Sequence, residues 1–587
     1  MKNKYIYIIC FLFVMGSCKK DFLEKPPLDE LSDETFWTSE NNARTAAFGF
    51  YSTYFIGYAN GFSPSPYYDG HYDKALSDDF AAVTPVEYIK QIPASGGGWS
   101  FSHTSSKPAS IRRANQFIEK VEEIEIGDKM SEEAKAHWIG VGRFFRAYEY
   151  CLLVQRFGDV PWFDKVLSEK DTELLYKPRD SRSFVMDKVL EDFKFAVENV
   201  RLDGGKDKLT VNKDVVLAFM SRMFLFEGTW QKYHENDEKK AKSYLEEAKW
   251  AANELISSGR YSLGNYREVF TSTDLSNNPE IILYRQYAAG ILTHCVMSYN
   301  NKEPQKNAAN KNLIDAYLAS DGLPIGISSQ YKGDKGIQNV MENRDGRIKE
   351  TFVSSKLMLP GETSADAVTG FSTHKFKNEA LANDPTGANA LNITDGPVIR
   401  YGEVLMNYAE AAVELATVGG SAFTNVDLDK SINVLRDRPG VDLPHLQVAG
   451  NLPVVDGIGS YEDPSRDGTV SPIIWEIRRE RRVELVYEGF RYDDLRRWKK
   501  LEYTDTEANP DINKGAWINK DEHSNLASDV VLDKDPAKKQ GYITPAWAGS
   551  SRRVFNDSRL YLYPLPLDQI VLYREHGVEL KQNPGWN

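Results

Sequence analysis

The densest group of ionisable side chains lies in one stretch, IRRERRVELVYEGFRYDDLRRWKK, at residues 477–500. Interleaved arginines and carboxylates of this kind could form an anion-binding or acid/base site. They also suit a half-buried helix whose arginines bridge neighbouring carboxylates and backbone carbonyls through their rigid forked geometry. Apolar residues such as Ile477, Val483 and Leu485 run through the same stretch. We therefore predict that its charges are structural partners.

Isolated charges in strongly apolar stretches are interpreted in the same way. Arg143 and Arg146 stand among phenylalanines and tyrosines, and Arg400 and Glu410 flank a mostly apolar run. Charged side chains are rarely buried without a partner. We expect each of these four to form a satisfied ion pair inside the fold and to take no part in catalysis.

The sequence contains no motif for a metal, a cofactor or a common enzyme. Its nine histidines are scattered, no two have helical ligand spacing, and there is no Cys-x-x-Cys pair. A Walker A loop, G-x-G-x-x-G and G-x-S-x-G are also missing. Paired carboxylates such as Asp78-Asp79 would serve a glycosidase only if two carboxyl groups lie roughly 5–10 Å apart. Sequence supplies no such distance, so we predict no catalytic residue, no metal and no cofactor.

Helical periodicity dominates the segments that must hold these side chains in place. Ser131 is a candidate N-cap for a helix that runs to Gly158, with apolar residues at every third or fourth position. Small alanines alternate with larger apolar residues in DEKKAKSYLEEAKWAANELISSG, which lets paired helices approach closely. These pairs resemble tetratricopeptide units, although no clean 34-residue repeat is present. Further helices are predicted at 181–200, 214–227, 237–259, 399–416, 428–435 and 472–487.

Long segments without periodicity lie between these helices, and they are rich in Gly, Asn, Ser, Tyr and Trp. Loops of such length are usually functional or disordered. We interpret them as ordered insertions, so the predicted fold is mainly all-α, a helix-pair scaffold with long irregular loops. The C-terminal YLYPLPLDQI and QNPGW are predicted to lie extended and to dock. The irregular segments are 63–106, 265–395, 441–470 and 501–555.

The N-terminus, MKNKYIYIICFLFVMGSCKK, has the pattern of an export signal. Two lysines precede an apolar run too short to span a bilayer, which needs ~20 residues. Gly16 and Ser17 then lead into Cys18, as in a bacterial lipoprotein signal, although Met15 stands where Leu is commoner. We predict cleavage before Cys18 and acylation of its thiol. The alternative is an ordinary secretory signal in which Cys18 is incidental.

Composition limits the partners of the exported chain. The 587 residues carry a formal net charge of −13, and removing the signal takes away two more positive charges. An acidic surface argues against a nucleic-acid partner. Two cysteines, Cys151 and Cys295, remain besides Cys10 and Cys18, too few for a disulfide scaffold. They could pair, but we favour isolated buried thiols.

Several motifs in chain order resemble the SusD/RagB family of outer-membrane lipoproteins. The most specific is Glu480-Arg481-Arg482-Val483-Glu484-Leu485 with Glu488-Gly489-x-Arg491 and Asp494-Leu495-x-Arg497-Trp498. Gly346 and Pro439 depart from the family pattern, which has Pro and Ala there, and they affect only turns. Further matches are Asp21-Phe22-Leu23-Glu24, Arg143-Phe-Phe-Arg-Ala-Tyr148, Gly158-Asp159-Val160-Pro161, Asp321-Gly322-Leu323-Pro324, Asn343-Arg344-Asp345-Gly346-Arg347, Arg400-Tyr401, Ala409-Glu410-Ala411, Ile432-Asn433-x-x-Arg436-x-Arg438, Tyr563-Pro564-Leu565-Pro566 and Gln582-Asn583-Pro584-Gly585-Trp586.

This resemblance implies a cell-surface binding protein without catalysis of its own. Family members cap a SusC-type TonB-dependent outer-membrane transporter, capture a glycan or oligosaccharide and close over the transporter during import. The implied location is the outer membrane, with a lipid anchor and the protein facing the exterior. The implied segments are 1–17 as signal peptide, 18–34 as tether, 35–260 as N-terminal helical scaffold with binding loops, and 261–587 as C-terminal domain with loop insertions.

The resemblance places ligand-binding rings in variable loops, since the shared motifs build the scaffold. Sugars present C–H patches to aromatic faces and hydroxyls to amides and carboxylates. Two parts of the chain have this chemistry, YYDGHYDKALSDD with the later GGGWSFSH, and RQYAAGILTHCVMSYNNKEPQ. Each ring could instead anchor a loop on the scaffold. The predicted ligand-binding residues are Trp99, Tyr67, Tyr68, Tyr72, Tyr287, Tyr299 and Asn300.

Three other functions remain open from the sequence. The same type of complex could import peptides, because RagB-like members are associated with peptide uptake. A surface glycosidase would cleave bonds in purified form. A helical scaffold that binds only proteins would have no small-ligand site.

Overall fold

The computed structural model describes residues 36–63, 65–67, 76–88, 92, 110–202, 207–546 and 552–586. The predicted signal peptide, the tether and Cys18 lie outside these residues. None of the helices within these ranges combines the length and the apolarity that a membrane crossing requires.

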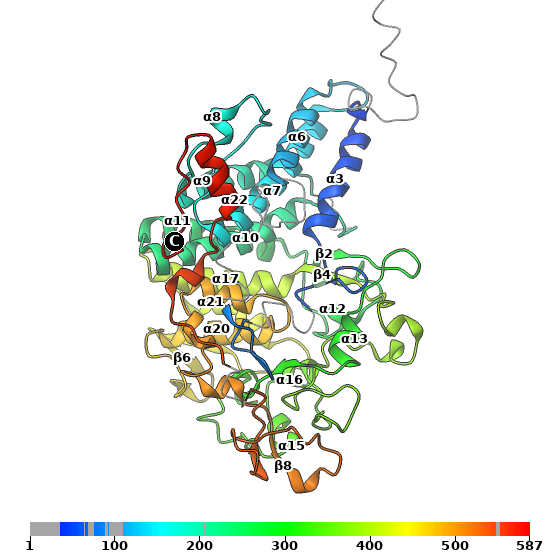
Figure 1. Cartoon of the computed structure of the whole chain (residues 1–587), viewed down its shortest axis with the longest axis vertical. Coiled ribbons are helices and arrows are strands. Elements are labelled where there is room, and N and C mark those ends of the chain that lie inside the picture. Colours follow the sequence, from blue (N-terminus) through cyan, green and yellow to red (C-terminus); the bar gives the residue numbers. More distant parts are fainter. Residues whose placement is uncertain are drawn as a thin grey trace, which may run out of the picture.

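A frame of long helices dominates the molecule, and consecutive helices pack on one another (Figure 1). α6 packs on α7, α7 on α9, α9 on α10, α10 on α11, α11 on α17 and α17 on α20. The predicted all-α helix-pair fold is therefore confirmed. The bounds are α3 (Glu40–Tyr54), α6 (Ser110–Glu123), α7 (Glu132–Phe157), α9 (Arg182–Asn199), α10 (Lys213–Trp230), α11 (Glu238–Ser258), α17 (Tyr401–Ala416) and α20 (Pro472–Glu484).

Local sequence signals set where these helices begin and end. The Ser131 hydroxyl accepts a hydrogen bond from the Ala134 amide at 3.0 Å, which caps α7. The Asp237 carboxylate accepts one from the Lys240 amide at 3.0 Å and caps α11. At the other end, Gly158 takes the positive φ of 75° that terminates α7. The predicted boundaries of both helices are confirmed.

Small residues allow the closest helix contact. A Cβ atom at Gly228 of α10 would lie 2.7 Å from the Cγ of Leu245 on α11, closer than real contacts allow. Ala248 and Ala252 of α11 are fully buried. The expected close approach through small side chains is what brings α10 and α11 together.

Three sequence predictions need correction. The predicted helix at 428–435 is two short helices, α18 (Asn425–Asp429) and α19 (Ile432–Arg436). The C-terminal segment is not extended throughout, because Pro566 sets the start of α22 (Leu567–Glu575). The sequence also assigned no helix to the ranges of α3 and α6. Docking of the C-terminus is confirmed, since Trp586 is buried and its indole nitrogen donates to the Leu562 carbonyl at 3.0 Å.

Short elements organise the irregular segments, which are ordered where they are described. Antiparallel pairing joins β1 to β3, β2 to β4, β5 to β6 to β7, and β8 to β9. The short helices are α8 (Thr172–Leu175), α12 (Glu268–Thr271), α13 (Val296–Asn301), α14 (Lys311–Ala316), α15 (Ile337–Met341), α16 (Arg347–Thr351) and α21 (Arg491–Arg497). The strands are β1 (Phe80–Ala82), β2 (Ile281–Arg285), β3 (Asn307–Ala309), β4 (Gly396–Arg400), β5 (Leu446–Ala449), β6 (Leu452–Val455), β7 (Gly459–Ser460), β8 (Trp517–Asn519) and β9 (Gln540–Tyr542).

Two hydrophobic clusters hold the frame and the central insertion. The larger draws on residues from Ala43 to Leu580, so distant parts of the chain share one core. The second, from Tyr58 to Ala516, lies under the segment that follows α11. Pairing of Phe80 with Ala309 brings the N-terminal irregular segment against the central one.

Candidate functional site

The charged C-terminal stretch forms a buried ion network. Glu484 accepts hydrogen bonds from Arg400 at 2.8 Å and from Arg347 at 3.0 Å, and lies 3.1 Å from Arg438. These side chains are at most 2% exposed. Burial alone would raise the pKa of Glu484, but Arg438, Arg400 and Arg347 lower it well below its usual range. For Glu484 at the centre of this stretch, the predicted structural role is confirmed.

The isolated charges of the apolar stretches have partners as well. Both Arg146 contacts with Asp192 are 2.8 Å long, in a paired geometry. Glu410 accepts from two nitrogens of Arg497 and from the indole of Trp498, each at 2.6 Å. These contacts stabilise the frame and occupy the carboxylates of Asp192 and Glu410.

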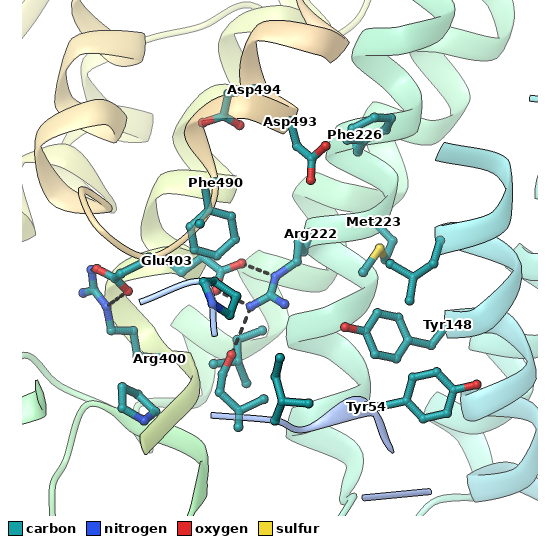
Figure 2. A pocket seen from close by; sticks show the side chains of 18 of the residues that line it. Tyr54, Tyr148, Arg222, Met223, Phe226, Arg400, Glu403, Phe490, Asp493 and Asp494 are labelled. Atoms are coloured by element: carbon teal, nitrogen blue, oxygen red, sulfur yellow. Dashed lines mark hydrogen bonds and ion pairs between the residues drawn. The ribbon is translucent and has the colours of Figure 1, made fainter. Parts of the chain in front are cut away.

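A cavity of about 570 Å³ lies between the helical frame and the C-terminal elements (Figure 2). This volume falls within the range of roughly 300–1,000 Å³ that is usual for small-molecule sites. α3, α7 and α10 form one side, and the β4–α17 junction and α21 form the other. Labelled lining residues are Tyr54, Tyr148, Arg222, Met223, Phe226, Arg400, Glu403, Phe490, Asp493 and Asp494.

The cavity presents aromatic faces with a few polar groups. The Tyr148 hydroxyl points into the cavity, whereas that of Tyr54 points away and donates to Glu149 at 2.7 Å (Figure 2). Burial raises the pKa of Tyr148 to about 12, so its hydroxyl keeps its proton at neutral pH. Half-buried Phe490 and Gln155 complete the lining. Such a surface suits a ligand with apolar faces and hydroxyl edges.

The acidic groups of the cavity are neutralised by arginines. Glu403 accepts from two nitrogens of Arg222, each at 2.6 Å (Figure 2). Asp493 accepts from Arg496 at 2.8 Å. Arg481 and Arg497 outweigh burial and lower the pKa of Asp494, which keeps that carboxylate ionised. A general acid needs the opposite shift, a raised pKa. In the described part of the chain, no group of three His, Cys, Asp or Glu side chains could hold a metal ion.

The two stretches predicted to bind ligand do come together. The Asn300 amide donates to the Tyr67 carbonyl at 2.9 Å, across 233 residues of sequence. The ring centroid of Tyr58 lies 4.9 Å from that of Tyr67 and 6.3 Å from that of Tyr287, so it contacts both stretches. Tyr67 also lines the cavity of Figure 2.

The predicted residues that are described differ in burial, and Tyr67, Tyr287 and Asn300 are buried. Tyr287 is 4% exposed and Asn300 is fully buried. The Tyr287 hydroxyl donates to the Ala59 carbonyl at 2.7 Å, and that of Tyr67 donates to the Pro397 carbonyl at 2.9 Å. Neither Tyr287 nor Asn300 presents a face to a ligand here, because each side chain anchors the insertion.

Tyr299 is the half-buried member of the set, and it has a neighbour that the sequence did not suggest. Phe62 is 63% exposed, and its ring centroid lies 6.2 Å from that of Tyr299. A bridge between Gly61 and His294 holds the two segments together. Phe62 stands in FIGYANGFSPSPYY, where its exposure could only have been suspected from the surrounding Gly and Asn. Trp99, Tyr68 and Tyr72 lie outside the described residues.

The remaining thiols are separate. Cys151 of α7 and Cys295 before α13 are both buried, neither forms a disulfide, and they belong to different core clusters. Burial raises the pKa of the Cys151 thiol well above its usual range. The expectation of isolated buried thiols is confirmed.

Comparison with known proteins identifies the family of this chain. A curated SusD-like protein P38 of Formosa agariphila is 23% identical over 515 residues, covering 84% of this chain and 90% of that protein. A SusD-like protein of Bacteroides ovatus is 24% identical over 292 residues, covering 49% of this chain and 50% of that protein.

Solved structures show the same fold. A SusD-like carbohydrate-binding protein of Bacteroides fragilis has a TM-score of 0.65 and 21% identity, covering 91% of this chain and 98% of that one. A second SusD-like protein of that organism has a TM-score of 0.62 and 23% identity, covering 96% and 100%. A model described as starch-binding associating with outer membrane matches residues 105–225. The model of the SusD family matches residues 279–586, more than half of the sequence, and the chain therefore belongs to the SusD family.

Proposed function

We propose that this chain is a cell-surface lipoprotein that captures a glycan or oligosaccharide and delivers it to a SusC-type TonB-dependent transporter in the outer membrane. The observation that carries the proposal is the cavity of Figure 2, which combines aromatic walls with carboxylates that are all held by arginines. Such a site can bind a hydroxylated ligand, and the lowered pKa of Asp494 makes that carboxylate unsuited to act as the general acid of hydrolysis. Membership of the SusD family supports capture without turnover.

The surface where Gly61 and Phe62 meet the central insertion extends this site. Phe62 and Tyr299 offer stacking faces there. Asn300, next to Tyr299, contacts Tyr67, which lines the cavity. The predicted rings Trp99, Tyr68 and Tyr72 lie outside the described residues, and we propose that they also bind the ligand.

The direct test is isothermal titration of the soluble form beginning at Lys19 against plant, host and microbial polysaccharides. We expect micromolar to millimolar binding to one class, with no product released on prolonged incubation. Tyr148→Phe and Asp493→Asn keep the shape of the cavity and should weaken binding, and Trp99→Ala tests the ring predicted from sequence. Phe184, 44% exposed on α9, provides the control Phe184→Ala.

The alternatives give different results in that experiment. If peptides bind and no polysaccharide does, peptide capture would replace glycan capture as the proposed function. Cleavage products from pure protein would establish a glycosidase. No binding of either ligand class would leave only a role in binding proteins.

Anchoring and delivery need their own measurements. We propose that Cys18 carries the acyl chains, since stable attachment takes two or more chains. Labelled palmitate should enter the wild-type protein and not Cys18→Ser, which should leave the membrane fraction. Co-purification of the acylated protein with a SusC-type transporter would support delivery, and its failure in intact outer membranes would contradict it.

A further inference from the structure

A second cleft lies on the other side of α20 and α21 from the cavity of Figure 2. It has a volume of about 720 Å³. On a helix with 100° per residue, positions 475, 479 and 482 of α20 lie within about 60° of one another, and Arg481 lies roughly 100° or more from them. The first three line the cleft and Arg481 lines the cavity. Other cleft residues come from α14, from residues 324–326 and 463–467, from the segment 509–514 and from β9.

Carboxylates hold the aromatic side chains of this cleft in fixed orientations. The Trp475 indole nitrogen donates to Asp463 at 2.9 Å, and the Tyr503 hydroxyl donates to Asp467 at 2.5 Å. The hydroxyl of Tyr542, at the far end, donates to Asp334. All three aromatic residues are half-buried. Their polar atoms are engaged at the wall, so a ring face can receive a ligand without first losing side-chain freedom.

The charges of the cleft are paired with one another. Asp78 contacts two nitrogens of Arg491, at 2.7 Å and 2.8 Å, and Asp79 contacts Arg482 at 2.6 Å. Further along, Lys514 contacts Asp511 at 2.6 Å.

Arg479 contacts Asp463, and its Nε lies 3.0 Å from Glu476. Lys311 contacts Asp315. An ionic ligand would have to break such pairs, whereas sugar hydroxyls can add to the free lone pairs of the carboxylates.

From this geometry we infer that the cleft is a second saccharide site, which takes a neutral oligosaccharide segment. Trp475 and Tyr503 are the stacking surfaces. The carboxylates of residues 463–467 and the side chains of Asn312 and Asn509 supply the hydroxyl partners. The inference rests on the proposed function, because it adds a second point of contact along the same glycan chain.

Footprinting by hydroxyl radicals tests this site in the unaltered protein. The probes are maltoheptaose, cellohexaose, xylohexaose and mannohexaose, with an oligogalacturonide as the charged comparison. We expect at least one neutral probe to protect the peptides that carry Trp475 and Tyr503, with an affinity that does not depend on salt. In titrations, Tyr503→Ala should lower the affinity for that probe roughly fivefold. Trp250, 40% exposed on α11, gives the control Trp250→Ala, which should change nothing.

Each outcome has a definite meaning. If a neutral probe binds but protects only residues of the Figure 2 cavity or the segment around Tyr299, the second site is wrong and the proposed function stands. If only the oligogalacturonide protects the cleft, in a salt-dependent way, a neutral ligand is wrong. If no saccharide binds the protein anywhere, both proposals fail.

Discussion

Two regions of this molecule use polar and aromatic side chains in opposite ways. Around α20, charged side chains are almost completely buried and each is held by several partners, as Glu484 is by Arg347, Arg400 and Arg438. Beside the central insertion, the ring of Phe62 is 63% exposed, and its centroid lies 6.2 Å from that of Tyr299. We therefore expect the first region to fix the fold, and the exposed ring to tolerate substitution without disturbing it.

The contrast explains why motifs in this chain are poor guides to its ligand. Residues of the most specific motif, such as Glu480 and Glu484, are buried among arginines. A buried ion pair cannot tolerate the loss of one partner, so these positions are constrained by folding. The exposed rings stand in sequence that has no motif at all.

The largest effect should come from breaking the buried network at its centre. Glu484→Gln keeps the shape of the side chain but removes the charge that faces three arginines. We expect the free energy of unfolding to fall by about 3–5 kcal/mol, or folding to fail. Denaturant unfolding followed by circular dichroism measures this.

A surface pair provides the matched control. Glu191 contacts Lys188 at 2.8 Å and is 62% exposed. Glu191→Gln should cost less than about 1 kcal/mol. If the free energy of unfolding fell equally in Glu484→Gln and Glu191→Gln, burial would not explain the strength of the network.

Acid should lower the stability of the frame, because buried carboxylates there depend on ion pairs. Burial opposes ionisation of Glu414, but Lys232 at 2.5 Å and Arg478 at 3.0 Å outweigh it and lower its pKa to about 2. Below its usual pKa near 4.5, the unfolded chain binds a proton here that the folded chain does not, so stability is lost as the pH falls towards 2. The contribution is about 3 kcal/mol at neutral pH. Unfolding measured across this range should show a shallower pH slope in Glu414→Gln.

The exposed pair should affect the ligand and leave the fold intact. Phe62→Ala should weaken glycan binding roughly two- to tenfold, because a ring contact contributes about 0.5–1.5 kcal/mol. The melting temperature should stay unchanged, since the side chain is mostly exposed. Titration and calorimetry of the same sample separate the two effects. A lower melting temperature with unchanged affinity would place Phe62 in the frame instead.

The smallest effect on stability is expected from treatment with a reducing agent. Cys151 and Cys295 are buried and form no disulfide, so a reducing agent should not shift the melting temperature of the form beginning at Lys19. A clear decrease would reveal a disulfide and would contradict their separation into two cores.

Exposure is the property that sequence reasoning could not supply for the predicted site. Tyr287 and Tyr299 stand twelve residues apart in similar surroundings of small and polar residues. One is 4% exposed and bound to the Ala59 carbonyl, while the other is half-buried beside Phe62. Their difference comes from residues 56–67, which fold back over the insertion, and no local pattern encodes that contact.

By itself, the sequence determined the helical frame, the structural role of its charges and the resemblance to the SusD family. Helix periodicity, N-caps such as Ser131 and terminators such as Gly158 act over a few residues, so they can be recognised in the sequence. Only the tertiary structure decided which arginine meets which carboxylate, that Asn300 anchors Tyr67, and that α20 and α21 separate a cavity from a cleft. These features depend on contacts between residues hundreds of positions apart, and burial follows from those contacts, not from residue type.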